Sequence, residues 1–390
     1  MTPLSLQEYL SREIGYDAER MDGTPDPALA RLITGISEAC KEISAKVREG
    51  ALAGVLGLAG SENVQGEDQK KLDIISNDIF VEAVSRTGSV CGMVSEEVPE
   101  PIAVRDDLPL GPYLACFDPL DGSSNIDINV SIGSIFAILP AREIKRTPET
   151  ADFLQPGTAL VAAGYCMYGP QTILVLTIGR GVVMFTLDDE TGIFRQTAAD
   201  VTVPREAAEF AINMSNQRFW EKPVQRYISE LLAGKDGPRG KNFNMRWIAA
   251  MVAEVHRILM RGGIFMYPRD SRNPERAGKL RLLYEANPMS MIMEQAGAAA
   301  TNGHVAIRTI KPTSIHERVA VFLGAAEEVE RAMAEQIRIS ETESPTFAEK
   351  VRGELIMELL REYGLTDVVM DESGNVVGRR PGTGAGPVLA

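Results

Sequence analysis

A cluster of carboxylates follows an apolar run near the end of the first third of the chain. Residues 113–127 read Y-L-A-C-F-D-P-L-D-G-S-S-N-I-D, and the apolar residues 113–117 predict a buried strand. Asp118, Asp121 and Asp127 follow that strand. Acids gathered at the end of a strand are suitable ligands for hard divalent cations.

Small residues come directly after these acids. Gly122, Ser123 and Ser124 offer backbone N–H groups and hydroxyls of the kind that hold a phosphate. The same stretch also fits an ordinary polar loop built on Asp-Pro and Asp-Gly turns. The choice between a site and a loop therefore depends on the rest of the chain.

Further carboxylates stand where other predicted strands end. Glu96 and Glu97 close an apolar run, and residues 279–285, K-L-R-L-L-Y-E, alternate as a strand that brings Glu285 to a strand-to-helix junction. Each of these acids alone is more typical of a surface residue. Together they form a set of oxygen ligands without histidine or thiol, which selects Mg²⁺, Mn²⁺ or Ca²⁺ rather than zinc. The residues thus predict a Mg²⁺-dependent phosphatase or a phosphate-binding protein.

The totals of the sequence narrow the class of protein. A chain of 390 residues is too long for one simple core, so we expect two lobes. The net charge of −14 argues against nucleic-acid binding. No apolar run reaches transmembrane length, and the four cysteines form no C-x-x-C pair. We expect a cytoplasmic protein that does not bind a membrane.

The elements that must position the acids can be read along the chain. Asp26 and Pro27 predict the start of an amphipathic helix that continues to about Gly50. Strands are expected at residues 130–139, 160–163 and 172–187, and the composition changes near residue 200. From about residue 340 the chain changes again, with a helix expected at residues 348–363 before a Gly/Pro-rich end.

Several motifs, taken together, resemble class I fructose-1,6-bisphosphatase. They are D-P-L-D-G-S-S-N-I-D, N-V-Q-G-E, K-K-L-D, S-E-E, A-A-G-Y, G-G-I-F-M-Y-P and G-K-L-R-L-L-Y-E-x-N-P-M. They occur in order over about residues 28–335. D-P-x-D-G alone marks the wider lithium-sensitive sugar and inositol phosphatase superfamily, whereas the S-S-N-I-D extension and K-L-R-L-L-Y-E are typical of the bisphosphatases.

The resemblance implies an α/β (α+β) protein with the layered αβαβα sugar-phosphatase fold of two lobes. Residues 1–200 would form the N-terminal lobe with the metal site, equivalent to the AMP domain, and residues 201–338 the C-terminal sugar-phosphate-binding lobe. Residues 339–390 would be an appendage of unknown role. The implied assembly is a homotetramer.

The implied activity is Mg²⁺-dependent hydrolysis of the 1-phosphate of fructose 1,6-bisphosphate to fructose 6-phosphate, in gluconeogenesis or the Calvin cycle, with Mn²⁺ as an alternative cation. The implied metal ligands are Glu96, Asp118, the Leu120 carbonyl, Asp121 and Glu285. The implied catalytic acids are Glu67, Asp73 and Glu97, with Asp73 or Glu97 accepting the proton of the attacking water.

The resemblance also assigns substrate contacts. The 1-phosphate would be held by Asp121, Gly122, Ser123 and Ser124, the sugar by Lys279, and the distal phosphate by Asn213, Arg246 and Tyr267. Arg246 would reach into the site of a neighbouring subunit. Asp127 would support the site without binding the metal.

Two departures from the family pattern affect regulation and specificity. Members inhibited by AMP carry T-G-E-L-T, a Lys-Tyr pair and an arginine where this chain has D-P-A-L-A, Pro112-Tyr113 and Pro140, so AMP inhibition should be weak or absent. Two tyrosines that contact the distal phosphate are replaced by Asn216 and Trp247. This leaves a sedoheptulose-1,7-bisphosphatase or a dual-specificity sugar bisphosphatase as the alternative enzyme, and a regulator that binds metal or sugar phosphate as the non-enzymatic alternative.

Overall fold

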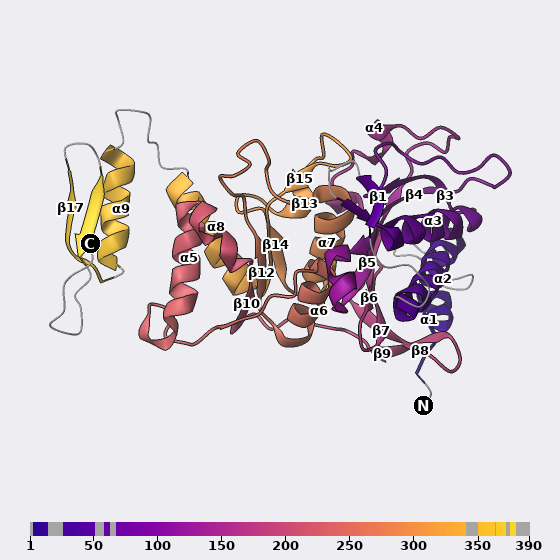
Figure 1. Cartoon of the computed structure of the whole chain (residues 1–390), viewed down its shortest axis with the longest axis horizontal. Coiled ribbons are helices and arrows are strands. Elements are labelled where there is room, and N and C mark those ends of the chain that lie inside the picture. Colours follow the sequence, from indigo (N-terminus) through magenta and orange to yellow (C-terminus); the bar gives the residue numbers. More distant parts are fainter. Residues whose placement is uncertain are drawn as a thin grey trace.

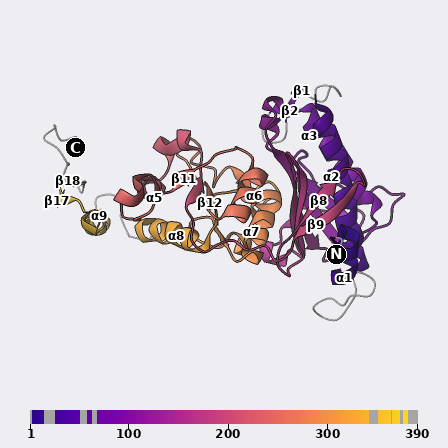
Figure 2. The same cartoon turned by 90° about the horizontal axis from the view of Figure 1, so that it is seen from below.

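The structure, a computed structural model, describes residues 3–14, 26–50, 58–62, 68–340, 350–362, 364–371 and 375–379. Two large β-sheets are separated by a layer of helices, and further helices cover the outer face of each sheet (Figures 1 and 2). This order of layers is the αβαβα arrangement predicted from the sequence, and that prediction is confirmed. Within the described segments, no helix combines the length and the apolar character needed to cross a membrane.

The N-terminal sheet has seven strands in sequence order. They are β3 (Val90–Ser95), β4 (Tyr113–Asp121), β5 (Ile132–Pro140), β6 (Ala162–Tyr168), β7 (Thr172–Thr177), β8 (Val183–Asp188) and β9 (Ile193–Ala198). β3 and β4 run parallel, and the other neighbours are antiparallel. Every residue of β4 is buried because helices cover both faces of the sheet, which explains its nearly continuous apolar sequence.

Three helices cover the outer face of this sheet: α1 (Leu6–Ile14), α2 (Pro27–Glu49) and α3 (Lys71–Arg86). α2 begins as predicted, because the side chain of Asp26 accepts a hydrogen bond from the Leu29 N–H at 3.0 Å and Pro27 has no N–H that would need an acceptor in the first turn. Its apolar residues pack against the sheet and α3 in one continuous core.

The C-terminal sheet has five strands, in the order β11 (Asn244–Met245), β10 (Glu209–Ala211), β12 (Ile264–Tyr267), β16 (Val321–Gly324) and β14 (Ala299–Thr301). The middle layer consists of α6 (Met251–Arg261) and α7 (Asn287–Gln295), which contact both sheets. α5 (Lys222–Ala233) and α8 (Ala326–Ser340) cover the far face of the C-terminal sheet (Figure 2). Both sheets thus share the apolar core around the middle helices.

The prediction of a strand over residues 279–285 was wrong for most of this segment. Only β13 (Leu280–Arg281) is a strand, paired with β15 (Arg318–Val319), and the chain then turns into the π-helical segment η6 (Leu282–Ala286), which leads directly into α7. Residues 282–286 are all buried. The alternation of residue types therefore does not separate a buried side from a side that faces solvent. The helical turn brings Glu285 back beside Arg281, whose N–H donates to its carboxylate at 2.5 Å.

Shorter elements complete the described chain. They are β1 (Leu58–Glu62), β2 (Asp68–Lys70), η2 (Ser123–Ile128), α4 (Thr150–Phe153), η3 (Gly157–Ala159), η4 (Met214–Phe219), η5 (Gly234–Asp236) and η7 (Ile307–Thr309). At the C-terminal end, the expected helix is α9 (Lys350–Glu362). It packs against a hairpin that sequence reasoning did not predict, β17 (Thr366–Met370) with β18 (Val376–Arg379), beside the main body (Figure 1).

Candidate metal and phosphate site

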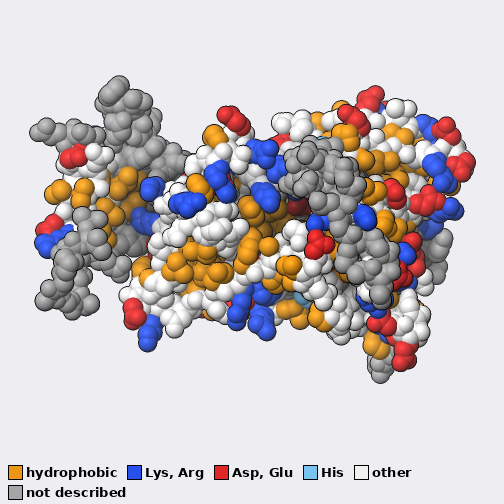
Figure 3. All heavy atoms as spheres, viewed as in Figure 1, with side chains coloured by type: hydrophobic (Ala, Val, Ile, Leu, Met, Phe, Trp, Pro, Cys, Tyr) orange, Lys and Arg blue, Asp and Glu red, His pale blue; other side chains and the backbone are white. Residues whose placement is uncertain are grey.

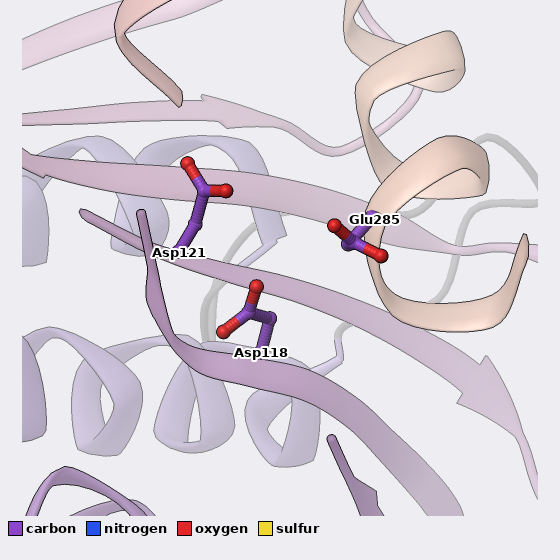
Figure 4. A group of neighbouring side chains, drawn as sticks. All are labelled: Asp118, Asp121 and Glu285. Carbon is purple, nitrogen blue, oxygen red and sulfur yellow. The ribbon is translucent and has the colours of Figure 1, made fainter. Parts of the chain in front are cut away.

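Three buried carboxylates meet between the N-terminal sheet and the middle helices. Asp118 and Asp121 come from the end of β4 and Glu285 from η6, and Figure 4 shows the three side chains directed toward a common space. Each offers an oxygen, and these oxygens all lie within 4.8 Å of one another. Residues predicted to bind metal from positions far apart in the sequence are therefore together in space.

The electrostatics of this acid cluster (Asp118, Asp121 and Glu285) favour a cation. Burial, followed by the nearby charges of Glu96, Asp121 and Glu285, raises the pKa of Asp118 well above its usual range. Burial also raises the pKa of Asp121 to about 7, with Glu285 adding to the shift. Carboxylates that repel one another in a buried site are stabilised in their ionised form by a bound divalent cation.

Two further groups reduce the repulsion within the cluster. Arg281 forms ion pairs with Glu96, which follows β3, and with Glu285, where Nη1 lies 3.6 Å from Oε2. The Val252 N–H, in the first turn of α6, donates to Asp121 Oδ2 at 2.8 Å and opposes the rise of that residue's pKa. Glu96 is itself buried and lines the same pocket, as does Leu120.

A β-bulge sets the direction of the acids on β4. Asp118 pairs with Ile135 and Asp121 pairs with Gly133, so β4 has one more residue than β5 between these pairs. The Pro119–Leu120 peptide is held at both ends, because Asp118 Oδ1 accepts from the Leu120 N–H at 2.9 Å and Ser134 Oγ donates to the Pro119 carbonyl at 2.7 Å. Bulges of this kind redirect side chains next to active sites.

The predicted phosphate-binding residues line the same pocket as the acid cluster. Gly122, Ser123 and Ser124 line a pocket of about 470 Å³ together with the acids. Gly122 has φ of +79°, and a Cβ there would lie 2.6 Å from that of Ala250. Glycine is therefore required, because the turn is left-handed and packs closely against the start of α6.

Two of the three predicted catalytic acids line this pocket. Asp73, in the first turn of α3, is buried, and burial together with the charge of Glu96 raises its pKa to about 6, although the Lys70 N–H donates to it at 2.7 Å. Glu97 is half-buried at the pocket wall. Glu67 lies outside the described residues.

The same pocket carries three of the four residues predicted for the sugar and the distal phosphate. Asn213, Tyr267 and Lys279 line it, and Lys279 Nζ lies 5.8 Å from the centre of the Tyr267 ring. Trp247 also lines it and stacks on Phe265. The fourth residue, Arg246, is exposed next to β11 and is not part of the wall of this chain's own pocket.

Some residues of the site were missed by sequence reasoning. Ser134 and Tyr168, whose hydroxyl oxygens lie 2.7 Å apart, belong to no motif, and Arg281 was assigned no role although it stands in K-L-R-L-L-Y-E. Their contacts depend on strand pairing and burial. Asp127, by contrast, lies outside the acid cluster and pairs with Lys70 at 2.6 Å, in line with a supporting role.

Comparison with known proteins gives a consistent family. Residues 11–199 match the family model for the fructose-1,6-bisphosphatase N-terminal domain, and residues 203–336 match that for the C-terminal domain. The chain is 36% identical to the Leishmania major fructose-1,6-bisphosphatase in its holo form, with a TM-score of 0.79 over 87% of this chain and 100% of that one. For the apo form of the same protein the identity is 35% and the TM-score 0.75, over 86% of this chain and 100% of that one. The chain therefore belongs to the fructose-1,6-bisphosphatase family, whose members are phosphoric monoester hydrolases.

Proposed function

We propose that this protein hydrolyses the 1-phosphate of fructose 1,6-bisphosphate to give fructose 6-phosphate and inorganic phosphate, with Mg²⁺ or Mn²⁺ as the cation. One observation carries the proposal: a single pocket is lined both by the acid cluster and by Lys279. A substrate with an anionic group at each end matches such a pocket, because the far phosphate is held while the near one reacts.

The residues present fit a hard divalent cation. Asp118, Asp121 and Glu285 would hold it, with Glu96 and the Leu120 carbonyl completing an all-oxygen ligand set. When bound, such a cation polarises the phosphoryl group, lowers the pKa of water and offsets the charge on the leaving oxygen.

The chain's own residues would orient the substrate. Asp121 and the N–H and hydroxyl groups of Gly122, Ser123 and Ser124 would hold the phosphate that is cleaved, which positions its phosphorus for attack opposite the C1 oxygen. Lys279 would contact the sugar, and Asn213 and Tyr267 the distal phosphate.

A carboxylate would accept the proton of the attacking water. Asp73 and Glu97 both line the pocket, and we favour Asp73 because a pKa raised to about 6 suits a group that accepts a proton near neutral pH. As the bond between the water oxygen and phosphorus forms, the bond between phosphorus and the sugar O1 breaks, and O1 takes up a proton. Glu67 remains a proposed third catalytic acid.

The assembly and the lobes are part of the proposal. The exposed position of Arg246 supports a homotetramer in which this residue completes the distal end of a neighbour's site. We assign residues 1–200 to the metal-binding lobe, 201–338 to the sugar-phosphate lobe and 339–390 to an appendage, and the two separate family matches support the first division. The four free, buried cysteines support a reducing compartment such as the cytoplasm.

Inhibition by AMP should be weak or absent. The side chain of Asp26 caps α2 and also accepts a hydrogen bond from the buried Tyr113 hydroxyl. Asp26 belongs to D-P-A-L-A and Tyr113 to the Pro112-Tyr113 pair, which are two of the places where this chain departs from AMP-inhibited members. Inhibition at micromolar AMP in a phosphate-release titration would contradict this.

Phosphorus NMR tests the proposed reaction. With Mg²⁺ present, the resonance of the C1 phosphate should disappear while fructose 6-phosphate and inorganic phosphate accumulate together. Fructose 6-phosphate supplied alone should remain intact. Cleavage at C6, or no cleavage, would refute the proposal.

A further inference from the structure

A second cavity adjoins the catalytic pocket. It has a volume of about 470 Å³ and shares Asn213, Tyr267 and Lys279 with the catalytic pocket. Its remaining wall comes from η4, from the loop between β12 and β13 and from β15. The two cavities therefore meet at Asn213, Tyr267 and Lys279.

The wall of this cavity is rich in cations. We call it the basic pocket, and its charged residues are Asp270, Arg272, Arg276, Lys279 and Arg318. On the face drawn in Figure 3, Lys and Arg side chains gather near the loops around β13 and β15. The whole chain has a net charge of −14, so this local excess of positive charge is a specific feature of the surface.

Two of these cations already have structural partners. Arg272 donates to both carboxylate oxygens of Asp270, at 3.2 and 2.6 Å, and its guanidinium lies 4.7 Å from the centre of the Phe219 ring. Arg318 Nη1 donates to the Lys279 carbonyl at 3.1 Å. These contacts hold the loop between β12 and β13 and the backbone at Lys279 in place.

The other two cations are available to a ligand. Over the residues that the structure describes, neither Arg276 nor Lys279 has a carboxylate within ion-pair distance, and both are exposed. A phosphate monoester carries close to two negative charges at neutral pH and matches such a pair.

The backbone between the two cations is held in place. A Cβ on Gly278 would lie 2.1 Å from the Val319 carbonyl carbon, so the chain before Lys279 runs directly against β15. The Arg276 N–H donates to the Asn273 carbonyl at 3.0 Å, which closes the turn that carries its side chain. The turn that carries Arg276 and the backbone before Lys279 are thus both held by contacts within the chain.

We propose that the basic pocket receives the distal phosphate of ketose bisphosphates longer than six carbons, with Arg276 as the residue that determines this specificity. The inference rests on the proposed function. One additional carbon moves the distal phosphate by about 1.5 Å, away from the acid cluster and past Lys279 toward Arg276. Asn216, which stands where a tyrosine is typical of the family, lines this pocket with a smaller side chain.

The test compares three substrates: sedoheptulose 1,7-bisphosphate, fructose 1,6-bisphosphate and fructose 1-phosphate, which has no distal phosphate. The variant is Arg276→Gln, with Arg276→Lys retaining the charge. Arg261→Gln is the control, because Arg261 is also exposed but lies on α6, outside both pockets. Thermal melting shows that each variant is folded.

The wild type should hydrolyse both bisphosphates. Arg276→Gln should raise KM for the seven-carbon substrate about tenfold, with a much smaller rise for fructose 1,6-bisphosphate and kcat little changed. Arg276→Lys should restore most of the affinity. Activity on fructose 1-phosphate, and all activities of Arg261→Gln, should stay at the wild-type level.

Several results would overturn the inference. Hydrolysis of fructose 1,6-bisphosphate without hydrolysis of the seven-carbon substrate would refute it and leave the proposed function intact. Equal effects of Arg276→Gln on all three substrates, or on both bisphosphates, would refute the role in chain length. A change confined to inhibition by inorganic phosphate would show that the pocket binds a free anion instead. Hydrolysis of none of the three by the wild type would remove the proposed function as well.

Discussion

Asp118, Asp121 and Glu285 bring three carboxylates into one buried space, and this makes stability depend on pH and metal together. The pKa of Asp121 is raised to about 7 and that of Asp73 to about 6. Groups with a raised pKa bind more protons in the folded state, so unfolding releases protons and stability falls as pH rises between the unfolded and folded values.

Without metal, the melting temperature should therefore fall between about pH 4 and pH 7, by on the order of 5 °C. Mg²⁺ binds the ionised acids and should remove most of this fall. The measurement is a series of thermal melts in chelator and in Mg²⁺, with Asp121→Asn as the comparison that flattens the chelator curve. Identical pH dependence in chelator and in Mg²⁺ would contradict the assignment of the acids.

The proposed role of Asp73 can be tested by substitution. As the proton acceptor, it should be needed for turnover but not for binding, so Asp73→Asn should lower kcat about 100-fold while KM changes little. Glu97→Gln is the matched control because it removes a carboxylate from the same pocket, and it should have a far smaller effect. The opposite ranking of the two variants would transfer the role to Glu97.

At the residue level, the sequence predicted the acids better than their partners. Asp118 and Asp121 belong to a motif, and Glu96 and Glu285 could be assigned through the family resemblance. Arg281 was visible only as part of an alternating run, and its ion pair with Glu96 depends on the turn at η6. Such tertiary pairs have no signal in a single sequence.

Among the elements, the bulge in β4 links the sheet to the chemistry. Ser134 donates to the Pro119 carbonyl, and its oxygen lies 2.7 Å from the Tyr168 hydroxyl, which must then be the donor to Ser134. Both side chains are buried. The pair fixes the orientation of the peptide that separates Asp118 from Asp121.

Ser134→Ala should therefore weaken metal binding about tenfold, because the bulge can relax and the acids lose their common direction. Isothermal titration with Mn²⁺ measures this directly, independently of activity. Ser134→Thr retains the hydroxyl and should rescue the affinity, which separates positioning from a general packing defect. Unchanged Mn²⁺ affinity in Ser134→Ala would show that the hydroxyl has no such role.

Sequence patterns predicted some helices and strands correctly and missed others. The helix from residue 27 was predicted correctly because Asp26, Pro27 and the apolar spacing agree. The strand expected at residues 279–285 failed because alternation in a fully buried segment carries no information about solvent-facing sides. The hairpin of β17 and β18 was hidden by the Gly-rich composition of its surroundings.

For the whole molecule, the layers explain how a site assembled from distant segments becomes one pocket. The seven-stranded sheet supplies Asp118 and Asp121, the segment leading into α7 supplies Glu285, and the loop after β12 leads to Lys279. The family resemblance allowed this layering to be predicted, whereas composition alone indicated only two lobes.

The proposed assembly leads to a test by subunit complementation. Arg246→Ala should raise KM for fructose 1,6-bisphosphate about tenfold while fructose 1-phosphate is unaffected, since one charge-assisted contact to the distal phosphate is lost. In mixed oligomers with Asp121→Asn, a subunit with intact acids regains Arg246 from its neighbour, so sites with wild-type KM should reappear. Mixed oligomers that never regain this KM would place Arg246 outside the neighbour's site.

We expect the acid cluster to hold the cation on which phosphate release depends. Phosphate release from fructose 1,6-bisphosphate should be measured with metal-stripped protein, before and after addition of Mg²⁺, for the wild type and for Asp121→Asn. We predict no release without Mg²⁺, full activity of the wild type with it, and a kcat lowered about 1000-fold or more in the folded variant. Full Mg²⁺-dependent activity of Asp121→Asn would show that the acid cluster does not hold this cation.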